Sequence, residues 1–237
     1  MRRRLLLLTA ALTAVIVPIQ AQRILLQEQP GADTVRSVFG PNRAYYNHFY
    51  LGYGLVAGPA AGPGAALRYG SSAEFALGLR NKFRVSQRLA VGLDLRYTRV
   101  AYHLAQNAQK LVPNAAQHHR EYLALPQAQL EGFVRLNQGR RGNVIGRYLD
   151  VGGWGGWVIS TTHYYEDRPG QGAKRVTVSE HGLDFLRRWS YGVGLRLGSS
   201  RYALSGRYRL SDVFRSPAGQ AYPELPRWVL GLELGWL

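Results

Sequence analysis

The sequence contains no cysteine and a single methionine among its 237 residues. Without cysteine there is no disulfide framework, no thiolate chemistry and no lipid anchor on a cysteine at an export cleavage site. Acidic residues are scarce too, because 14 Asp and Glu stand against 30 Lys and Arg, for a formal net charge of +16. Long apolar runs are also missing: the most apolar stretch, Leu5–Val17, is shorter than the ~20 residues of a membrane-spanning helix. These absences exclude a helical membrane protein.

The first 21 residues have the pattern of a secretory signal peptide. Three consecutive arginines at 2–4 precede the apolar run Leu5–Val17, which Pro18 closes, and the small residue Ala21 suits cleavage before Gln22. Removing residues 1–21 leaves a net charge of +13. An exported protein seldom meets nucleic acid, so we predict no nucleic-acid partner. We expect the positive charge to pair inside the protein or to meet anionic lipid such as lipopolysaccharide phosphate.

The segment 188–210 shows the pattern that predicts the fold. Apolar and polar residues alternate on both sides of a short Gly-Ser-Ser break. Because successive side chains of a β-strand point to opposite faces, this pattern predicts a β-hairpin with one apolar and one charged face. The apolar face carries Trp189, Tyr191, Val193, Leu195, Leu197, Tyr202, Leu204, Gly206, Tyr208 and Leu210.

The same alternation predicts six further strands, at about 47–57, 73–85, 89–103, 122–136, 147–160 and 227–237. Long and short connections take turns, with lengths of 15, 3, 18, 10, 24, 3 and 16 residues. Bacterial outer-membrane barrels combine an even strand number with short periplasmic turns and longer extracellular loops. We therefore predict an all-β fold over residues 47–237, an eight-stranded antiparallel up-and-down transmembrane β-barrel with both termini in the periplasm. It would follow the signal peptide and an irregular segment, 22–46.

Two local features complete this prediction. Asn81 falls on the apolar face of its strand by strict counting, which suggests a bulge there. The residues Thr161–Asp184 are expected to form the longest loop.

The charged face of the strands indicates which side is the inside. A set containing so many charges cannot form the dry interior of a soluble lipocalin-like barrel, the main structural alternative, but it can pair within a narrow wet lumen. An eight-stranded barrel is filled by its own side chains, so a diffusive porin is disfavoured. The predicted inner face carries eleven cations and five acids, namely Arg80, Lys82, Arg84, Arg96, Arg135, Arg188, Arg196, Arg201, Arg207, Arg209, Arg227, Glu74, Asp94, Glu131, Asp150 and Glu233.

Aromatic residues near the strand ends predict two interfacial girdles, since amphipathic rings favour headgroup depth. The external girdle would hold Tyr97, Tyr122, Trp189, Tyr208 and Trp228, and the periplasmic one Phe49, Phe83, Tyr202 and Trp236. We interpret Trp154-Gly-Gly-Trp157 as a site of curvature and lipid contact. Gly192 and Gly194 lack the third glycine of a nucleotide-binding loop. We predict instead that these two glycines leave space on the lumen face of their strand.

Two short segments carry a family pattern. The first is Tyr122-Leu123-Ala124-Leu125-Pro126, followed by a strand and a basic turn, and the second is Tyr148-Leu149-Asp150-Val151-Gly152-Gly153. From about residue 47 to the end, the chain resembles the PorT-like outer-membrane β-barrel domain family. The resemblance implies an outer-membrane barrel of eight strands, mostly without known activity, with some members assisting protein secretion. Gln127 and Gln129 depart from the pattern, which is usually apolar there.

Candidates for catalysis are few. Ser160 or Thr161, with His163 and either Glu166 or Asp167, could supply a hydrolytic triad, because hydrolysis needs a nucleophile, a histidine and an orienting carboxylate. Such a site would suit a lipid A-modifying hydrolase or acyltransferase. The bland alternative, which we favour, is that these are polar loop residues.

A metal site is the second possibility. His118, His119 and Glu121 include potential metal ligands, but adjacent histidines of a strand point to opposite sides, and no His-Glu-x-x-His helix is present. We predict no catalytic residue, no metal and no cofactor.

The expected function is therefore non-enzymatic. We expect an outer-membrane barrel with a structural or interaction role through long extracellular loops, with an accessory role in protein secretion as the first alternative and lipid modification as the second. Its partners would be outer-membrane lipids and lipopolysaccharide, and a protein bound at the loops. The alternating Leu232, Leu234 and Trp236 resemble the C-terminal signal that the barrel-insertion machinery reads.

Overall fold

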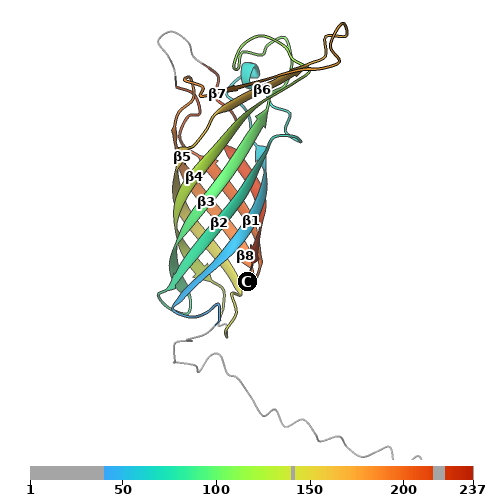
Figure 1. The fold of residues 1–237 in the computed structure, drawn as a ribbon. Coiled ribbons are helices and arrows are strands. Elements are labelled where there is room, and N and C mark those ends of the chain that lie inside the picture. Colours follow the sequence, from blue (N-terminus) through green and yellow to red (C-terminus); the bar gives the residue numbers. More distant parts are fainter. Residues whose placement is uncertain (1–39, 140–141, 216–221, 237) are drawn as a thin grey trace, which may run out of the picture. The chain divides into compact units, whose positions relative to one another are not determined.

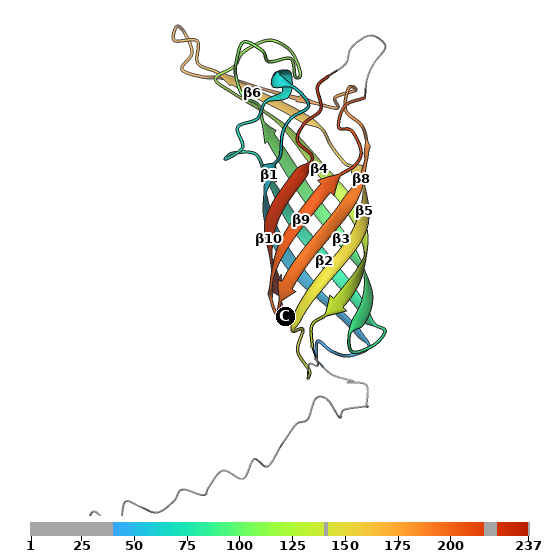
Figure 2. The same cartoon turned by 180° about the vertical axis from the view of Figure 1, so that it is seen from behind.

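The computed structural model describes residues 40–139, 142–215 and 222–236, and they form a closed antiparallel β-barrel (Figures 1 and 2). Each wall strand pairs with the next along the chain, and β1 pairs with β10 to close the sheet. The predicted eight-stranded antiparallel up-and-down barrel is confirmed. The wall strands are β1 (Tyr45–Ala57), β2 (Ala73–Arg84), β3 (Leu89–His103), β4 (Arg120–Asn137), β5 (Arg147–Val158), β8 (Trp189–Ser199), β9 (Tyr202–Arg209) and β10 (Trp228–Trp236).

Helical structure is nearly missing from the described residues, which contain one 3₁₀ turn, Pro63–Ala65. In this part of the chain, no helix is long and apolar enough to cross a membrane. The predicted signal peptide, 1–21, and residues 22–39 of the predicted irregular segment lie outside the described residues. Its last residues, 40–44, form turns against the short-turn end of the barrel, where the side-chain Nδ2 of Asn42 donates to the carbonyl of Gly142 at 2.9 Å.

The prediction that Thr161–Asp184 forms a loop is wrong, because most of this segment forms a β-hairpin. Strands β6 (Thr162–Asp167) and β7 (Val176–His181) pair with each other, and β6 also pairs with the first residues of β4, Arg120–Ala124. The hairpin therefore continues the sheet beyond the barrel wall and projects from the long-loop end (Figure 1).

Strand β4 changes partners partway along its length. Residues 120–124 pair with β6, and residues 127–137 pair with β5. Pro126 lies at this change of partner, and its carbonyl accepts a hydrogen bond from the amide of Ile159 at 2.9 Å. In an antiparallel strand, the carbonyl and the N–H of one residue point to the same side. Proline has no N–H, and at Pro126 that side faces the gap between β5 and β6, so no hydrogen bond of the ladder is lost.

The predicted bulge at Asn81 is also wrong. Its pairing with Asn47 on β1 and Leu93 on β3 is continuous, without an extra residue. The polar side chain is accommodated instead by Tyr45, whose hydroxyl donates to Asn81 Oδ1 at 2.7 Å.

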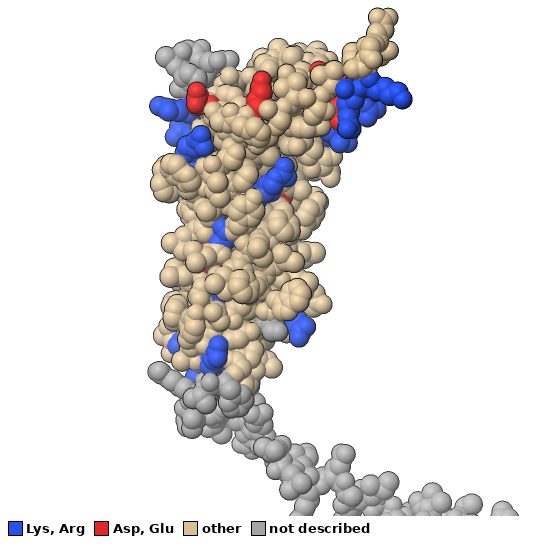
Figure 3. All heavy atoms as spheres, in the orientation of Figure 1, with Lys and Arg blue, Asp and Glu red and all other residues tan. Residues whose placement is uncertain are grey.

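The two faces of the wall separate apolar from charged residues as predicted, except at the strand ends. There Arg201, predicted to face inward, is exposed, and Arg188, also predicted to face inward, is half-buried and lines a groove with the outward residues Trp189 and Tyr191. Leu95, Leu232 and Trp236 point outward and are 56 %, 66 % and 78 % exposed. By contrast, Arg80 and Asp94 point inward and are 1 % and 0 % exposed. Figure 3 shows one side of this wall as mainly uncharged surface, with most Lys and Arg atoms towards its two ends.

The barrel interior has two layers of different chemistry. Towards the short turns it is filled with charged and aromatic side chains. At the long-loop end the loops fold inward and close the barrel with an apolar cluster, which we call the cap. The cap core consists of Val56, Ala65, Leu67, Val100, Tyr102, Leu104, Val112, Leu123, Leu125, Val158, Leu186, Val213, Phe214 and Leu225.

The cap explains why β4 alternates poorly in sequence. Leu123 and Leu125 face inward, but the interior they meet is the apolar cap core and not the charged layer. Ala124 would point to lipid if strict alternation held along β4, but it is 1 % exposed. Tyr122, predicted to lie in the external girdle, stacks on Tyr164 of β6 with ring centroids 4.7 Å apart.

Candidate functional site

The charged layer of the interior is centred on Glu233 of β10. Its carboxylate lies 2.7 Å from Nη2 of Arg80, 3.3 Å from Nη1 of Arg96 and 2.9 Å from Nε of Arg196. The side chain of Glu233 is 2 % exposed. A carboxylate this deeply buried is stable only if such cations surround it.

The remaining members extend this arrangement into a network. Arg135 binds Asp150 at 2.7 Å, Arg96 binds Glu74 at 2.7 Å, and Arg196 binds Glu131 at 2.8 Å. Five arginines and five carboxylates take part, so their formal charges cancel. The members are Arg80, Arg96, Arg135, Arg196, Arg207, Glu74, Asp94, Glu131, Asp150 and Glu233.

Aromatic rings fill the rest of this layer. The guanidinium of Arg135 lies 3.6 Å from the ring centre of Tyr148, and that of Arg207 lies 4.4 Å from the ring of Trp154. The predicted lipid contact of Trp154 is therefore wrong, because this side chain faces inward and is 8 % exposed. Trp157 faces outward and is 44 % exposed.

Each large ring lies over a glycine of a neighbouring strand. A Cβ on Gly192 would come within 2.7 Å of the Trp154 ring, and one on Gly198 within 2.0 Å of the Tyr148 ring. Gly192 thus makes room on the lumen face, in agreement with its interpretation from sequence. The space between Glu74, Arg96, Arg207 and Glu233 is about 10 Å³, too little for a ligand.

A second polar cluster lies in the cap, where the hairpin meets β4. His163 Nε2 lies 2.8 Å from Oε1 of Glu121, and its Nδ1 lies 2.8 Å from Oε2 of Glu180. Lys110 Nζ lies 2.5 Å from the other oxygen of Glu121. Burial acts to lower the pKa of His163, but hydrogen bonds to Glu121 and Glu180 outweigh it and raise this pKa above its ordinary value.

The pKa of Glu121 is shifted in the opposite direction. Burial acts to raise its pKa, but hydrogen bonds from His163, Lys110 and Gln106 outweigh burial and lower the pKa of this carboxyl. The imidazolium and carboxylate forms therefore stabilise each other, and the pair ties the hairpin to β4.

The structure does not assemble the candidate triad. His163 faces Glu121 and Glu180, so both ring nitrogens are already engaged. Thr161 Oγ1 accepts a hydrogen bond from the amide of Leu183 at 2.7 Å. Oε1 of Glu166 lies 3.4 Å from Nε of Arg168. In the described residues, neither Ser160 nor Thr161 forms a hydrogen bond with His163.

The histidines considered for a metal are separated as well. His118 Nδ1 lies 2.9 Å from Oδ2 of Asp167, whereas His119 is exposed and Glu121 is buried against His163. Among the described residues, no group of three or more His, Asp or Glu side chains is placed to hold a metal ion.

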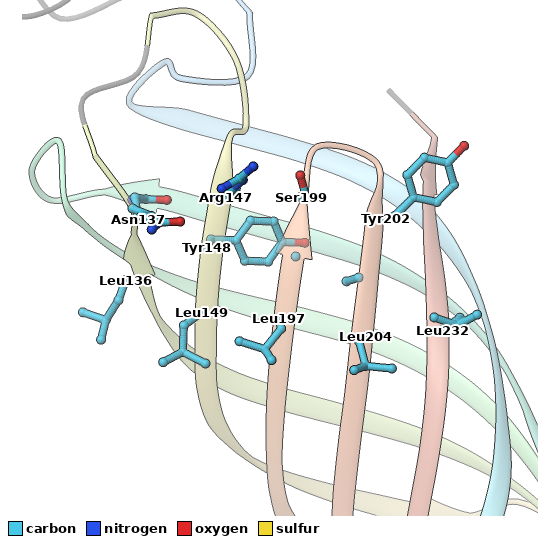
Figure 4. Close-up of a pocket in the computed structure, with 13 residues that line it drawn as sticks. Leu136, Asn137, Arg147, Tyr148, Leu149, Leu197, Ser199, Tyr202, Leu204 and Leu232 are labelled. Carbon is cyan, nitrogen blue, oxygen red and sulfur yellow. The ribbon is translucent and has the colours of Figure 1, made fainter.

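An apolar groove of about 620 Å³ lies on the wall towards the short turns (Figure 4). Five leucines from neighbouring strands line it, each in register with the next: Leu136, Leu149, Leu197, Leu204 and Leu232. Arg147, Ser199 and Tyr202 also contribute to its lining. A groove of this composition suits a hydrocarbon chain, and no histidine or carboxylate of the described residues lines it.

Some of these features could have been found from the sequence. Trp154 and Trp157 are three residues apart, and an odd spacing places them on opposite faces of a strand. The partners Lys110 and Glu180 carried no such signal, because they lie in connections whose path alternation does not define. The sequence matches no family model, and no curated protein matches it.

Proposed function

We propose that this chain is an outer-membrane protein whose barrel spans the bilayer, with a closed interior and an external cap that binds other molecules. Both termini of the barrel then lie on the periplasmic side, and the cap and hairpin face the outside. In this role the protein acts structurally and by binding partners, without catalysis.

The observation that carries this proposal is the belt of outward apolar side chains around the wall. Most of the outward leucines, valines and aromatic residues of the wall strands are between 40 % and 78 % exposed. An apolar patch of this extent is costly in water and stable against acyl chains. The charged side chains of the same strands are enclosed in the interior, which is the reverse of the arrangement in a soluble barrel.

Aromatic residues at the two ends of the belt support the same conclusion. Trp189 and Trp157 lie together near the cap, with ring centroids 4.8 Å apart, and Trp228 pairs with Tyr208 at the same distance. At the other end, Trp236 and Tyr202 are 78 % and 68 % exposed. Such rings favour the two headgroup layers of a bilayer.

The filled interior argues against a pore, and the engaged His163 argues against a hydrolase. What the cap offers is a surface for binding. Strand β7 is the last strand of the sheet order and pairs with β6 alone among the described strands. Its outer edge can therefore receive an extended segment of a partner protein by strand addition. The accessory role in secretion, implied by the resemblance to PorT-like barrels, stays a prediction.

Surface labelling tests the location and orientation together. The chain has no cysteine, so Gln171→Cys at the hairpin tip and Arg88→Cys in the opposite short turn each create a single thiol. In intact Gram-negative cells, a membrane-impermeant maleimide should label the Gln171→Cys variant, and the Arg88→Cys variant should react only after lysis. Labelling of Arg88→Cys alone would reverse the orientation. Recovery of both variants in the soluble fraction would refute the membrane location.

A further inference from the structure

We propose that a basic groove at the cap end of β8 binds the phosphate headgroup of a lipid, with lipid A-type phosphoglycolipids as the chemical class. The groove has a volume of about 550 Å³. This inference rests on the proposed membrane location and adds a defined lipid site to it. Three arginines, Arg187, Arg188 and Arg215, line the groove together with apolar side chains of the wall.

The floor of the groove belongs to the apolar belt. Trp189, Tyr191 and Leu210 line it and are 65 %, 56 % and 49 % exposed. These residues lie at the cap end of the wall, where the proposed bilayer meets water. A ligand here would therefore contact hydrocarbon-like surface on one side and cations on the other, as an anionic lipid requires.

Two of the arginines are held by the backbone. Leu186 and Phe214 form an antiparallel bridge, and both are buried in the cap core. The amide of Arg187 donates to the carbonyl of Val213 at 2.8 Å, and the amide of Arg215 donates to the carbonyl of Phe185 at 2.7 Å. The bridge thus fixes where both guanidinium groups leave the cap.

The charges in the groove are unbalanced. Nε of Arg187 donates to the carbonyl of Phe214 at 3.0 Å, which orients this guanidinium and leaves its terminal nitrogens available. Within the described part of the chain, no carboxylate oxygen lies within 4.0 Å of the three guanidinium groups. Asp212 also lines the groove, but it binds Arg227 at 2.5 Å.

This excess of positive charge suits a phosphate better than a carboxylate. The three guanidinium groups present planar, always charged donors, which match the several oxygens of a phosphate monoester. The membrane-facing floor selects a phosphate that carries acyl chains over a free phosphate. Arg187 and Arg215 are exposed and Arg188 is half-buried, so each alone contributes little and binding depends on the three acting together.

The test measures lipid binding to the full mature chain in detergent by native mass spectrometry. The probes are bisphosphorylated lipid A, the same lipid without phosphates, and inorganic phosphate. The triple variant Arg187→Gln, Arg188→Gln, Arg215→Gln should bind bisphosphorylated lipid A about tenfold more weakly than the unaltered chain. The unaltered chain should bind dephosphorylated lipid A about as weakly as the variant does, and inorganic phosphate should not displace the lipid.

The matched control removes three arginines elsewhere in the cap. Arg120→Gln, Arg168→Gln, Arg175→Gln has the same net charge, and these positions are exposed on β4 and around the hairpin turn. It should retain the affinity of the unaltered chain. Equal losses in both triple variants would mean a diffuse charge effect and overturn the site, as would no loss in either. Full displacement by inorganic phosphate would overturn the lipid assignment.

Two further measurements keep the outcome interpretable. The single variants Arg188→Gln and Arg215→Gln should each weaken binding about twofold to fivefold, which does not depend on folding of the triple variant. Electrophoresis without boiling reports whether each variant is a folded barrel. A folded, membrane-located barrel that binds no phosphorylated lipid refutes this site and leaves the proposed function standing, whereas a soluble protein refutes the proposed function itself.

Discussion

The substitution Glu233→Gln tests the charged interior most severely. This carboxylate faces three guanidinium groups, those of Arg80, Arg96 and Arg196, and the network of five arginines and five carboxylates is formally neutral. Glutamine keeps the size of the side chain but leaves one buried positive charge unbalanced. Removing one partner of a buried ion pair costs about 3–5 kcal/mol, and we expect this loss in the free energy of unfolding.

The assay is urea unfolding of the protein refolded into phospholipid vesicles, followed by tryptophan fluorescence. Asp212→Asn is the matched control, because Asp212 has a single partner, Arg227, and its side chain is 50 % exposed. This exposed pair should contribute about 0.2–1 kcal/mol. Equal costs for Glu233→Gln and Asp212→Asn would refute the buried network.

The double variant Arg80→Gln, Glu233→Gln sharpens the result. It restores the formal neutrality of the network, so the combined cost should be smaller than the sum of the two single costs by about 1–3 kcal/mol. Strict additivity would mean that Arg80 and Glu233 do not interact, despite the 2.7 Å between their charged atoms.

Three other perturbations follow from the same structure. Leu232→Arg on the outer face should cost ~2–4 kcal/mol near the bilayer midplane, and Ser205→Ala on the inner face should cost less; equal costs in vesicle unfolding would contradict the assignment of the two faces. In planar bilayers the protein should give no steady conductance, since side chains fill its lumen, and porin-like steps would disprove a closed interior. Because the pKa of His163 is raised, its charged form stabilises the cap fully below pH 6.5, and this contribution is lost as the pH rises through the folded-state pKa. Because the pKa of Glu121 is lowered, its charged form stabilises the cap fully above pH 4.5, and this contribution is lost as the pH falls through the folded-state pKa. Hydrogen exchange in residues 162–181, corrected for intrinsic rate, should therefore be slowest between pH 4.5 and 6.5, and His163→Asn should remove the loss on the alkaline side; the same pH profile in both proteins would contradict the pairing.

The wall of the barrel could be predicted from the sequence because one physical rule governs it. A strand with lipid-like surface on one side and an enclosed charge network on the other must alternate, and segments such as 89–98 of β3 do so. Strand number and face assignment follow from that alternation. The pairing of particular charges does not, since Glu233 and Arg80 are 153 residues apart and meet only through closure of the barrel.

The cap could not be predicted in the same way. Its residues are selected for packing among loops, so Leu123 and Leu125 break the expected polarity where the interior changes from charged to apolar. The hairpin β6–β7 was missed because both its faces are polar or half-exposed, and no buried face imposes a two-residue period. Its signals were local ones: β-branched Val176, Thr177 and Val178, and glycines at 170 and 172, both with positive φ in the turn.

The most direct test of the inverted polarity uses the two tryptophans of β5. Two variants would each keep one of them, Trp154 or Trp157, with phenylalanine at the other four tryptophan positions, and both would be refolded into vesicles containing brominated lipid. Trp157 points outward and Trp154 lies inside against Arg207, so bromine on the acyl chains should quench Trp157 strongly and Trp154 weakly. Equal quenching of the two, or stronger quenching of Trp154, would contradict a barrel that turns its apolar side to the membrane and its charges inward.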